Sequence, residues 1–186
     1  MTAATDDYVL TASRVEQERR RCIRTFTGLY VNPLQLRPED IDYRDLAHHL
    51  SLICRYTGAC PEHYSVAQHS VYVAQAMKKR YGDAEAALAG LLHDAEEAYF
   101  NDIASPVKHD PRMAWYCELA DEARRMIFEK YGVDEHWYKK TKVYDDQCFK
   151  DEVASWWGDD LRIVPWGPKM AEKRFLQIFS ELRVQL

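Results

Sequence analysis

The sequence predicts an all-α protein, built as a bundle of about six to seven helices. Apolar residues recur at intervals of three and four along most segments, as they do on the packed face of a helix. Gly82 and Gly132 each follow such a segment and are typical helix stop residues. Because no segment alternates apolar and polar residues in the way that a sheet requires, we expect helices packed on helices.

The composition fits a globular protein of 186 residues, of which 47% are hydrophobic and 30% are charged. A net charge of −5 argues against nucleic acid as the main partner but is compatible with a local basic pocket for phosphate. The five cysteines form no CxxC pair, which fits reduced thiols in the cytosol. Without a secretory signal or an apolar run near 18 residues, we expect a soluble cytoplasmic protein with no membrane partner.

We expect one domain over residues 1–186, with helical additions to its core in residues 1–24 and 159–186. The first helix should cover residues 6–24 and be exposed or face a partner, because its apolar residues are sparse. A basic cluster ends it, made of Arg19, Arg20, Arg21 and Arg24. We interpret this cluster as a solvated face; the alternative is a contact with an anionic substrate or a neighbouring subunit. Residues 25–39 should form a loop with a short extended pair.

The next helix should cover residues 40–54, with Asp42 as its N-cap and with His48 and His49 in structural roles. A turn follows, and the helix after it should cover residues 65–81. The remaining segments are expected as a helix over 84–98, a proline-stiffened loop over 102–108, helices over 111–131 and 134–157, and a terminal amphipathic helix over 169–186.

One stretch places a histidine and three carboxylates close together. His93 and Asp94 follow a buried alanine- and leucine-rich run, and Glu97 and Asp102 come within nine positions. Charged groups at the end of a buried helix cost free energy unless they are paired or bound to metal. If the helix continues, Glu97 rises over the face of His93 one turn on. The stretch is a candidate for metal-assisted hydrolysis, although alone it fits a solvated acidic helix end equally well.

The rest of the chain completes a pattern of one histidine, then the His-Asp pair, then a late aspartate. The segments that carry it are Arg55-Tyr56, Tyr64 to Ser70, Leu91 to Ala98, Asp102 with Pro106 to Lys108, and Lys142 to Asp145. This order resembles the HD-domain metal-dependent phosphohydrolase superfamily, whose motif is H…HD…D on a helical bundle. More narrowly, it resembles the branch of bacterial 5′-deoxynucleotidases and phage dATP triphosphohydrolases. The resemblance covers roughly residues 25–160.

The resemblance implies three metal ligands, which are His69, His93 and Asp94. It leaves Asp145 or Asp146 as the fourth, and we choose Asp145 because the family's late aspartate is followed seven residues on by a glutamate, here Glu152. Two imidazoles and two carboxylates suit one divalent ion such as Mn²⁺, Co²⁺, Fe²⁺, Ni²⁺ or Zn²⁺. Calcium and magnesium prefer all-oxygen ligands. Such an ion can lower the pKa of a bound water from about 15.7 towards about 7.

The resemblance also implies the roles of six further residues. The two catalytic carboxylates correspond to Glu97 and Asp102; one would activate the attacking water and the other assist the leaving oxygen, in a division that stays open. The phosphate-binding cations correspond to Arg55, Lys108 and Lys142. Tyr56 stands where relatives carry an aromatic residue, often tryptophan, against the sugar or base. Glu96 matches no such position, and we expect it to face solvent.

We therefore expect a metal-dependent phosphohydrolase of 2′-deoxynucleotides, leaning towards a triphosphohydrolase of dATP or another purine deoxynucleotide. The alternatives are a 5′-deoxynucleotidase on deoxynucleoside monophosphates, a hydrolase of a cyclic or alarmone nucleotide, and an inactive metal-stabilised nucleotide-binding module. The intact pair Glu97 and Asp102 argues against the inactive module. The resemblance also implies a homo-oligomer, as a dimer or hexamer, in the cytosol of a bacterium or of a phage-infected host.

Overall fold

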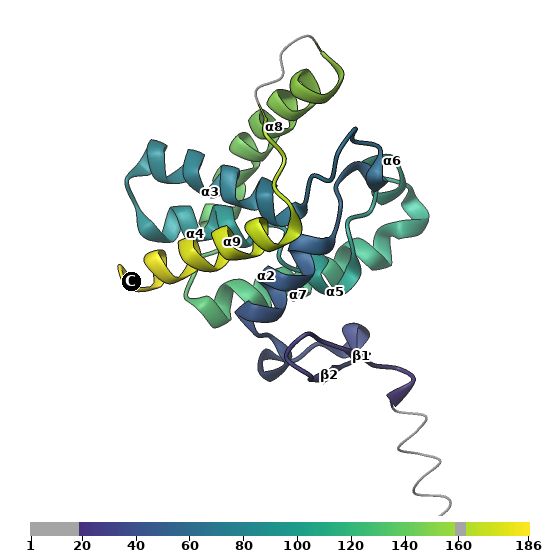
Figure 1. The fold of residues 1–186 in the computed structure, drawn as a ribbon. Coiled ribbons are helices and arrows are strands. Elements are labelled where there is room, and N and C mark those ends of the chain that lie inside the picture. The colour runs from purple at the N-terminus through teal and green to yellow at the C-terminus, as the bar shows by residue number, and fades with distance from the viewer. Residues whose placement is uncertain (1–18, 159–162) are drawn as a thin grey trace, which may run out of the picture.

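The computed structural model describes residues 19–158 and 163–186. Within these ranges the fold is mostly helical, which confirms the predicted all-α bundle (Figure 1). Six of the described helices are long: α2 (Tyr43–Leu52), α3 (Val66–Tyr81), α4 (Ala84–Leu92), α7 (Ala114–Tyr131), α8 (His136–Trp157) and α9 (Pro168–Arg183). The short elements are α5 (Glu97–Phe100), α6 (Ser105–Lys108), the 3₁₀ turns η1 (Pro33–Gln35), η2 (Pro38–Asp40), η3 (Tyr56–Gly58) and η4 (Pro111–Met113), and the strands β1 (Ile23–Arg24) and β2 (Tyr30–Val31).

Helices α3 and α4 form the centre of the bundle and lie unusually close together. Ser65 caps α3 by accepting a hydrogen bond from the backbone N–H of Gln68, and Asp83 caps α4 in the same way. A Cβ atom on Gly90 would lie 2.9 Å from the Cα atom of Ala74. Because only glycine avoids that clash, Gly90 lets the end of α4 rest directly on α3.

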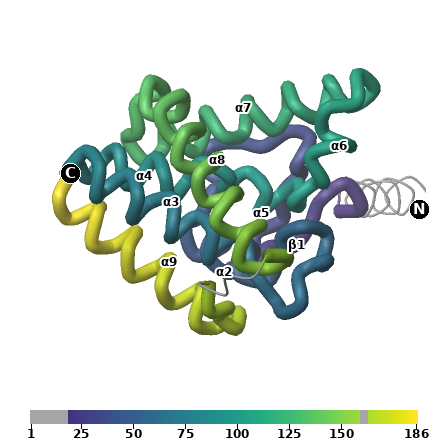
Figure 2. Tube along the Cα trace, turned by 90° about the horizontal axis from the view of Figure 1, so that it is seen from above, coloured from purple at the N-terminus to yellow at the C-terminus, as the bar shows by residue number. Residues whose placement is uncertain are grey.

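The other long helices enclose this pair. Figure 2 shows α7 along one side of the bundle and α9 along the other. The last helix, α9, packs against α2, α3 and α4, and its residues in the core are Ala171, Phe175, Phe179 and Leu182. Helix α8 crosses α3 and α4, and its C-terminal end projects from the bundle in Figure 1. None of the described helices combines the length and the hydrophobicity needed to span a lipid bilayer.

The small ribbon of β1 and β2 precedes the bundle, and a buried carboxylate fixes the loop between its strands. Asp45 of α2 accepts hydrogen bonds from the backbone N–H of Thr27 at 2.6 Å and from its hydroxyl at 2.7 Å. The ribbon confirms the predicted extended pair only in part, because β2 lies within residues 25–39 but β1 precedes them. Since Ile23 and Arg24 form β1, the helix predicted over residues 6–24 is wrong at its end. Residues 6–18 of that predicted helix lie outside the described residues.

Two further boundaries differ from the prediction. The helix expected over residues 84–98 ends at Leu92, and tight turns lead from it into α5. In these turns Ala95 donates its backbone N–H to the carbonyl of Leu92, three residues back, and Glu97, Ala98 and Tyr99 donate with the same spacing. The loop expected over 102–108 contains α6, because Pro106 fits the first turn of a helix, where its missing N–H costs nothing.

Candidate metal centre

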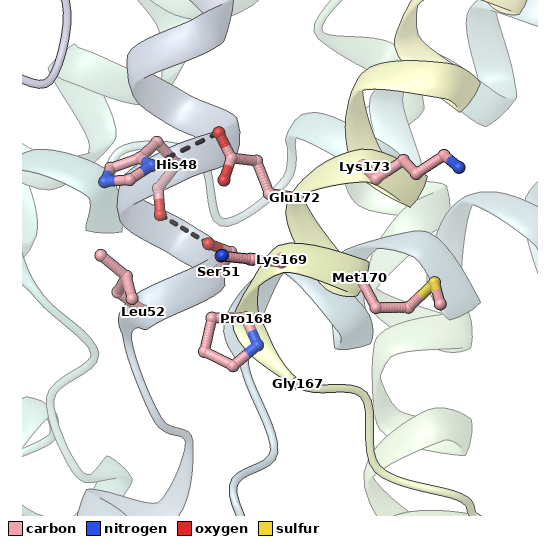
Figure 3. Close-up of a pocket in the computed structure, with 9 residues that line it drawn as sticks. All are labelled: His48, Ser51, Leu52, Gly167, Pro168, Lys169, Met170, Glu172 and Lys173. Carbon is pink, nitrogen blue, oxygen red and sulfur yellow. Dashed lines mark hydrogen bonds and ion pairs between the residues drawn. The ribbon is translucent and has the colours of Figure 1, made fainter.

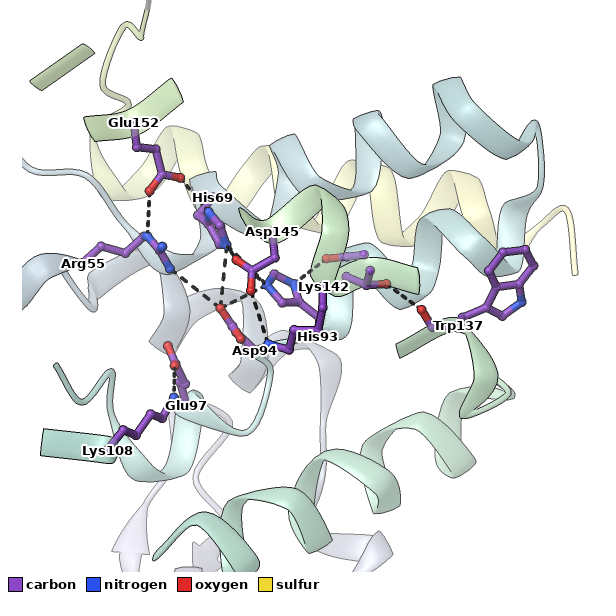
Figure 4. A network of polar contacts seen from close by, with 12 residues as sticks. Arg55, His69, His93, Asp94, Glu97, Lys108, Trp137, Lys142, Asp145 and Glu152 are labelled. Carbon is purple, nitrogen blue, oxygen red and sulfur yellow. Dashed lines mark hydrogen bonds and ion pairs between the residues drawn. The ribbon is translucent and has the colours of Figure 1, made fainter. Parts of the chain in front are cut away.

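Four side chains from three separate parts of the chain meet at one point inside the bundle (Figure 4). They are His69 from α3, His93 and Asp94 from the turn after α4, and Asp145 from α8. One ligand atom of each lies within 4.8 Å of the others. Nε2 of His69 lies 3.3 Å from Nε2 of His93 and 3.1 Å from Oδ1 of Asp145, and Nε2 of His93 lies 3.1 Å from Oδ2 of Asp94. These four residues, the predicted ligands, could hold a metal ion.

The fold explains why the two histidines meet. His69 stands in the first turn of α3, and His93 is the C-cap of α4. Because Gly90 brings α4 against α3 one turn before His93, the two imidazoles face each other with both rings fully buried. The α4 end is thus placed by packing rather than by any contact between the ligands themselves.

Hydrogen bonds from the far side of each ring fix which nitrogen points inward. Nδ1 of His93 donates to the backbone carbonyl of Gly90 at 2.8 Å, and Nδ1 of His69 donates to Oε1 of Glu152 at 2.6 Å. Both partners are acceptors, so in a neutral ring the proton sits on Nδ1 and the lone pair on Nε2. Both Nε2 atoms are therefore oriented to bind a cation, the arrangement that metal-binding histidines generally show.

Glu152 is a site residue whose role the sequence reasoning missed. It served only to choose between Asp145 and Asp146, yet its carboxylate is fully buried and accepts hydrogen bonds from the hydroxyls of Tyr64 at 2.8 Å and Tyr56 at 2.5 Å. Burial alone would raise the pKa of Glu152, but His69 lowers it to about 2. The spacing of Glu152 could have indicated this role, because a residue seven positions after Asp145 lies two turns further along the same face of the helix.

The charges of the ligand cluster balance one another in the metal-free protein. Burial disfavours protonation of His93, but the carboxylates of Asp94 and Asp145 outweigh it and raise the pKa of the imidazole to about 10. Conversely, burial opposes ionisation of both carboxyl groups. His93 holds the pKa of Asp94 well below its usual range, and His69 together with His93 does the same for Asp145. The cluster is therefore built around one positive charge at its centre, which a proton on His93 supplies when no metal is bound.

The three basic residues predicted to hold phosphate border this cluster. Nη1 of Arg55 lies 3.7 Å from Oδ2 of Asp94, and Nζ of Lys142 lies 3.2 Å from Oδ2 of Asp145. Nζ of Lys108 pairs with Oε1 of Glu97 at 3.2 Å. Their neighbouring carboxylates raise the pKa of all three, although burial opposes this, so each stays charged.

Tyr56 lies beside Arg55 in a strained turn. Tyr56 and Thr57 both have left-handed backbone angles, with φ of 57° and 53°, which non-glycine residues adopt at a cost of about 1–3 kcal/mol each. The ring centroid of Tyr56 lies 5.2 Å from that of Trp157 and 6.1 Å from that of Phe149. The turn thus aims the Tyr56 hydroxyl at Glu152 while its ring joins the exposed aromatic end of α8.

The two predicted catalytic carboxylates lie near the cluster, and the pKa of each is raised above its usual value. Burial raises the pKa of Glu97 well above its usual range, Asp94 adds to this, and Lys108 only partly offsets it. Burial also raises the pKa of Asp102, against the opposing charge of Arg55. A carboxyl group with a raised pKa can both accept and release a proton near neutral pH, as acid–base chemistry requires.

The expectation that Glu96 faces solvent is wrong, because its side chain is buried and only 7% exposed. The turns after Leu92 are tighter than the α-helix that was predicted there. This tighter winding rotates Glu96 inward. Residues three apart align in such turns, so Glu97 lies over Asp94 rather than over His93. Burial and the charge of Asp94 raise the pKa of Glu96 to about 7.

The other histidines lie outside the cluster and make structural contacts. Those on α2 were predicted to be structural: His48 lies 3.3 Å from a carboxylate oxygen of Glu172, and His49 lies 2.9 Å from the carbonyl of Ala98. Asp146 is exposed, whereas Asp145 points into the cluster, which agrees with the choice of Asp145 as fourth ligand.

A groove elsewhere on the molecule shares no residue with this centre. It has a volume of about 810 Å³ and lies between α2 and α9 (Figure 3). Its walls are mostly apolar and include Leu52, Pro168 and Met170, with Lys169 and Lys173 at its edge. None of the predicted metal-binding, catalytic or phosphate-binding residues lines this groove.

Two bacterial proteins are similar to the chain in sequence, while no family model matches it. The uncharacterized protein YfdR of Escherichia coli K12 is 36% identical over 175 residues, an alignment that covers 86% of the chain and 94% of YfdR. An uncharacterized protein of Rhodobacter capsulatus is 33% identical over 119 residues, which cover 62% of the chain and 60% of that protein.

Proposed function

The chain belongs to the family of the Escherichia coli protein YfdR, and from the geometry of its buried centre we propose that it is a metal-dependent phosphohydrolase of 2′-deoxynucleotides. The observation that carries the proposal is the convergence of His69, His93, Asp94 and Asp145 within 4.8 Å. The order of these residues along the chain matches the H…HD…D motif of the HD-domain superfamily, to which we assign the protein.

The donor set supports a transition metal as the cofactor. Two imidazole nitrogens with two carboxylates favour Mn²⁺, Co²⁺, Fe²⁺, Ni²⁺ or Zn²⁺ over the harder Ca²⁺ and Mg²⁺. When bound, such an ion supplies Lewis acidity, which lowers the pKa of a water molecule and draws electrons from a phosphoryl oxygen. Glu152 and the Gly90 carbonyl keep the histidines oriented for this ion.

The residues around the centre would bind the substrate and transfer protons. Arg55, Lys108 and Lys142 would bind phosphate oxygens and neutralise the charge that develops during transfer. Glu97 and Asp102, with their raised pKa values, would transfer protons: one would accept the proton of the attacking water and the other would donate a proton to the leaving oxygen. Tyr56 lies beside Arg55, where the sugar or base would follow the phosphate.

We further propose a purine deoxynucleoside triphosphate, with dATP preferred, as the substrate. Arg55, Lys108 and Lys142 border one centre and offer three separate contacts for phosphate oxygens, which supports a triphosphate. The runner-up is a 5′-deoxynucleotidase acting on monophosphates, and the resemblance leaves cyclic and alarmone nucleotides as a lesser alternative. We also propose that the protein works as a homo-oligomer in the bacterial or phage-infected cytosol.

A substrate panel tests this proposal. Protein loaded with Co²⁺ or Mn²⁺ is given ribo- and deoxynucleotides as mono- and triphosphates, and the products are separated. The proposal expects deoxynucleoside plus triphosphate or stepwise phosphate from dATP. Orthophosphate from dAMP alone would establish the runner-up. Tight nucleotide binding without turnover under any metal would establish the inactive binding module instead.

A further inference from the structure

A second group of carboxylates lies beside the four metal ligands. Asp94, Glu96 and Glu97 each offer one oxygen, and these three oxygens lie within 4.8 Å of one another. In Figure 4, Asp94 stands between the His69–Asp145 group and Glu97. The tight turns after α4 produce this group, because they align Glu97 with Asp94 and turn Glu96 inward.

The carboxyl groups of Glu96 and Glu97 have oxygens that the described residues around them leave without partners. Glu96 and Glu97 are only 7% and 3% exposed, and Oε2 of each has no hydrogen-bond partner among the described residues. Lys108 reaches only Oε1 of Glu97, at 3.2 Å. A buried carboxylate oxygen without a partner costs free energy, so something outside the chain is expected to satisfy it.

Asp94 belongs to both groups of metal-binding side chains. Its Oδ2 faces the first centre, at 3.1 Å from Nε2 of His93 and 3.8 Å from Nε2 of His69. The ion pair of Asp94 with Arg55 also uses Oδ2. One carboxylate can therefore serve two cations, one through each oxygen, as in the paired metal sites of phosphate-processing enzymes.

We propose that Asp94, Glu96 and Glu97 bind a second divalent cation of the oxygen-preferring kind, Mg²⁺ or Mn²⁺, with Asp94 shared between the two centres. The all-carboxylate donor set favours a hard ion, unlike the mixed nitrogen and oxygen set of the first centre. With this cation bound, Glu97 acts as its ligand and Asp102 is left as the carboxyl group that transfers protons, while Lys108 is released to bind phosphate. That consequence for substrate rests on the proposed function, whereas cation binding itself does not.

Counting bound ions tests the second site without any substrate. The first centre is filled with one equivalent of Co²⁺, and Mn²⁺ is then titrated while free Mn²⁺ is followed by electron paramagnetic resonance. The proposal expects one further ion per chain in the wild type and its loss in Glu96→Gln, with the visible spectrum of Co²⁺ retained. Glu118→Gln, at an exposed position on α7, is the control and should keep both ions.

Several results would overturn the proposal. One is a wild type that takes up no Mn²⁺ beyond the Co²⁺ equivalent; another is a folded Glu96→Gln variant that still takes it up. An infrared band of a protonated carboxylic acid that disappears in Glu96→Gln and persists at saturating Mn²⁺ would show a shared proton in place of the ion. Should Glu96→Gln fail to fold, Mn²⁺ anomalous scattering from wild-type crystals decides between a peak at these three carboxylates and none.

Discussion

Nδ1 of His69 donates a 2.6 Å hydrogen bond to Oε1 of Glu152, a carboxylate that is fully buried. The same carboxylate accepts hydrogen bonds from Tyr56 and Tyr64 and lies 3.3 Å from Nε of Arg55. Glu152 therefore joins a metal ligand to the residues proposed to meet the substrate. Without it, the His69 ring would lose the partner that fixes its orientation.

Replacing Glu152 should weaken metal binding without removing a ligand. Glu152→Gln keeps the shape but removes the charge that holds the His69 proton on Nδ1, and we expect metal affinity to fall by about 10- to 100-fold. Isothermal titration with Co²⁺ measures the loss, and the visible spectrum of bound Co²⁺ should change. Asp151→Asn, at the exposed neighbouring position, is the control and should leave affinity unchanged. Equal affinities for Glu152→Gln and wild type would contradict the assigned role.

The close packing of α4 on α3 should be sensitive to a single methyl group. In Gly90→Ala, the new Cβ would meet the Cα of Ala74 at 2.9 Å, so the helices must separate. We expect a loss of about 1–3 kcal/mol in the free energy of unfolding, together with weaker metal binding because His93 moves with α4. Urea unfolding and metal titration measure the two effects. A variant as stable as wild type, with unchanged affinity, would show that this contact does not place His93.

Metal binding should release a proton and strengthen with rising pH. The pKa of His93 is about 10 in the metal-free protein, and only the neutral imidazole binds a metal, so each ion must displace that proton. Below pH 10 the apparent affinity should rise by up to about tenfold per pH unit. Titrations in buffers of different ionisation enthalpy count the protons released. Binding at neutral pH without proton release would contradict the charge balance described above.

The raised pKa of His93 also makes the stability of the metal-free protein depend on pH. Because the folded pKa of His93 lies above its unfolded value of about 6.5, this residue stabilises the fold fully below pH 6.5. The contribution is lost as pH rises through about 10. Unfolding of chelator-treated protein should therefore become easier across this range. The metal-loaded protein should lack this dependence, which provides an internal control.

Lys142 should affect substrate binding through its charge. Lys142→Met removes a cation 3.2 Å from Asp145 that we assign to phosphate, and KM for dATP should rise by about 10- to 100-fold, the effect of losing one charge-assisted hydrogen bond of about 1.5–3 kcal/mol. Lys139→Met, one turn earlier on the same helix and exposed, is the control. The same rise in both variants would indicate a general electrostatic effect instead of a phosphate contact.

Asp102 should affect turnover but not metal content. Asp102→Asn removes an acid–base group that ligates neither proposed ion, so kcat should fall by about 10²- to 10⁴-fold while the number of bound ions stays the same. Metal analysis of the purified variant and steady-state kinetics measure both quantities. Unchanged kcat would remove Asp102 from the catalytic pair and leave Glu97 as the acid–base candidate.

The sequence was most informative where one residue decides a local structure. Asp42 and Gly82 cap their helices as expected, since capping depends on a residue and its nearest backbone groups. The four residues that meet in the buried cluster were predicted together from their order along the chain. The end of α4 at Leu92 was not foreseen, because the buried residues Ala95 and Ala98 continue the apolar pattern of a helix.

The roles of Glu96 and Glu152 depend on tertiary packing that no local pattern reports. Glu96 follows a helix that was expected to continue, and its burial results from the tighter turns that replace the helix. Glu152 meets His69 only because α8 crosses α3. Both residues are glutamates, which are ordinarily expected to be exposed to solvent. Only the folded structure shows that they are buried.

The central claim is that His69, His93, Asp94 and Asp145 bind one divalent transition metal. An anomalous-difference map from crystals grown with Co²⁺, recorded at the cobalt absorption edge, tests it most directly. The account predicts a peak about 2 Å from Nε2 of both histidines and within bonding distance of both carboxylates. No peak among these four side chains, or a peak bound by other residues in their place, would contradict it.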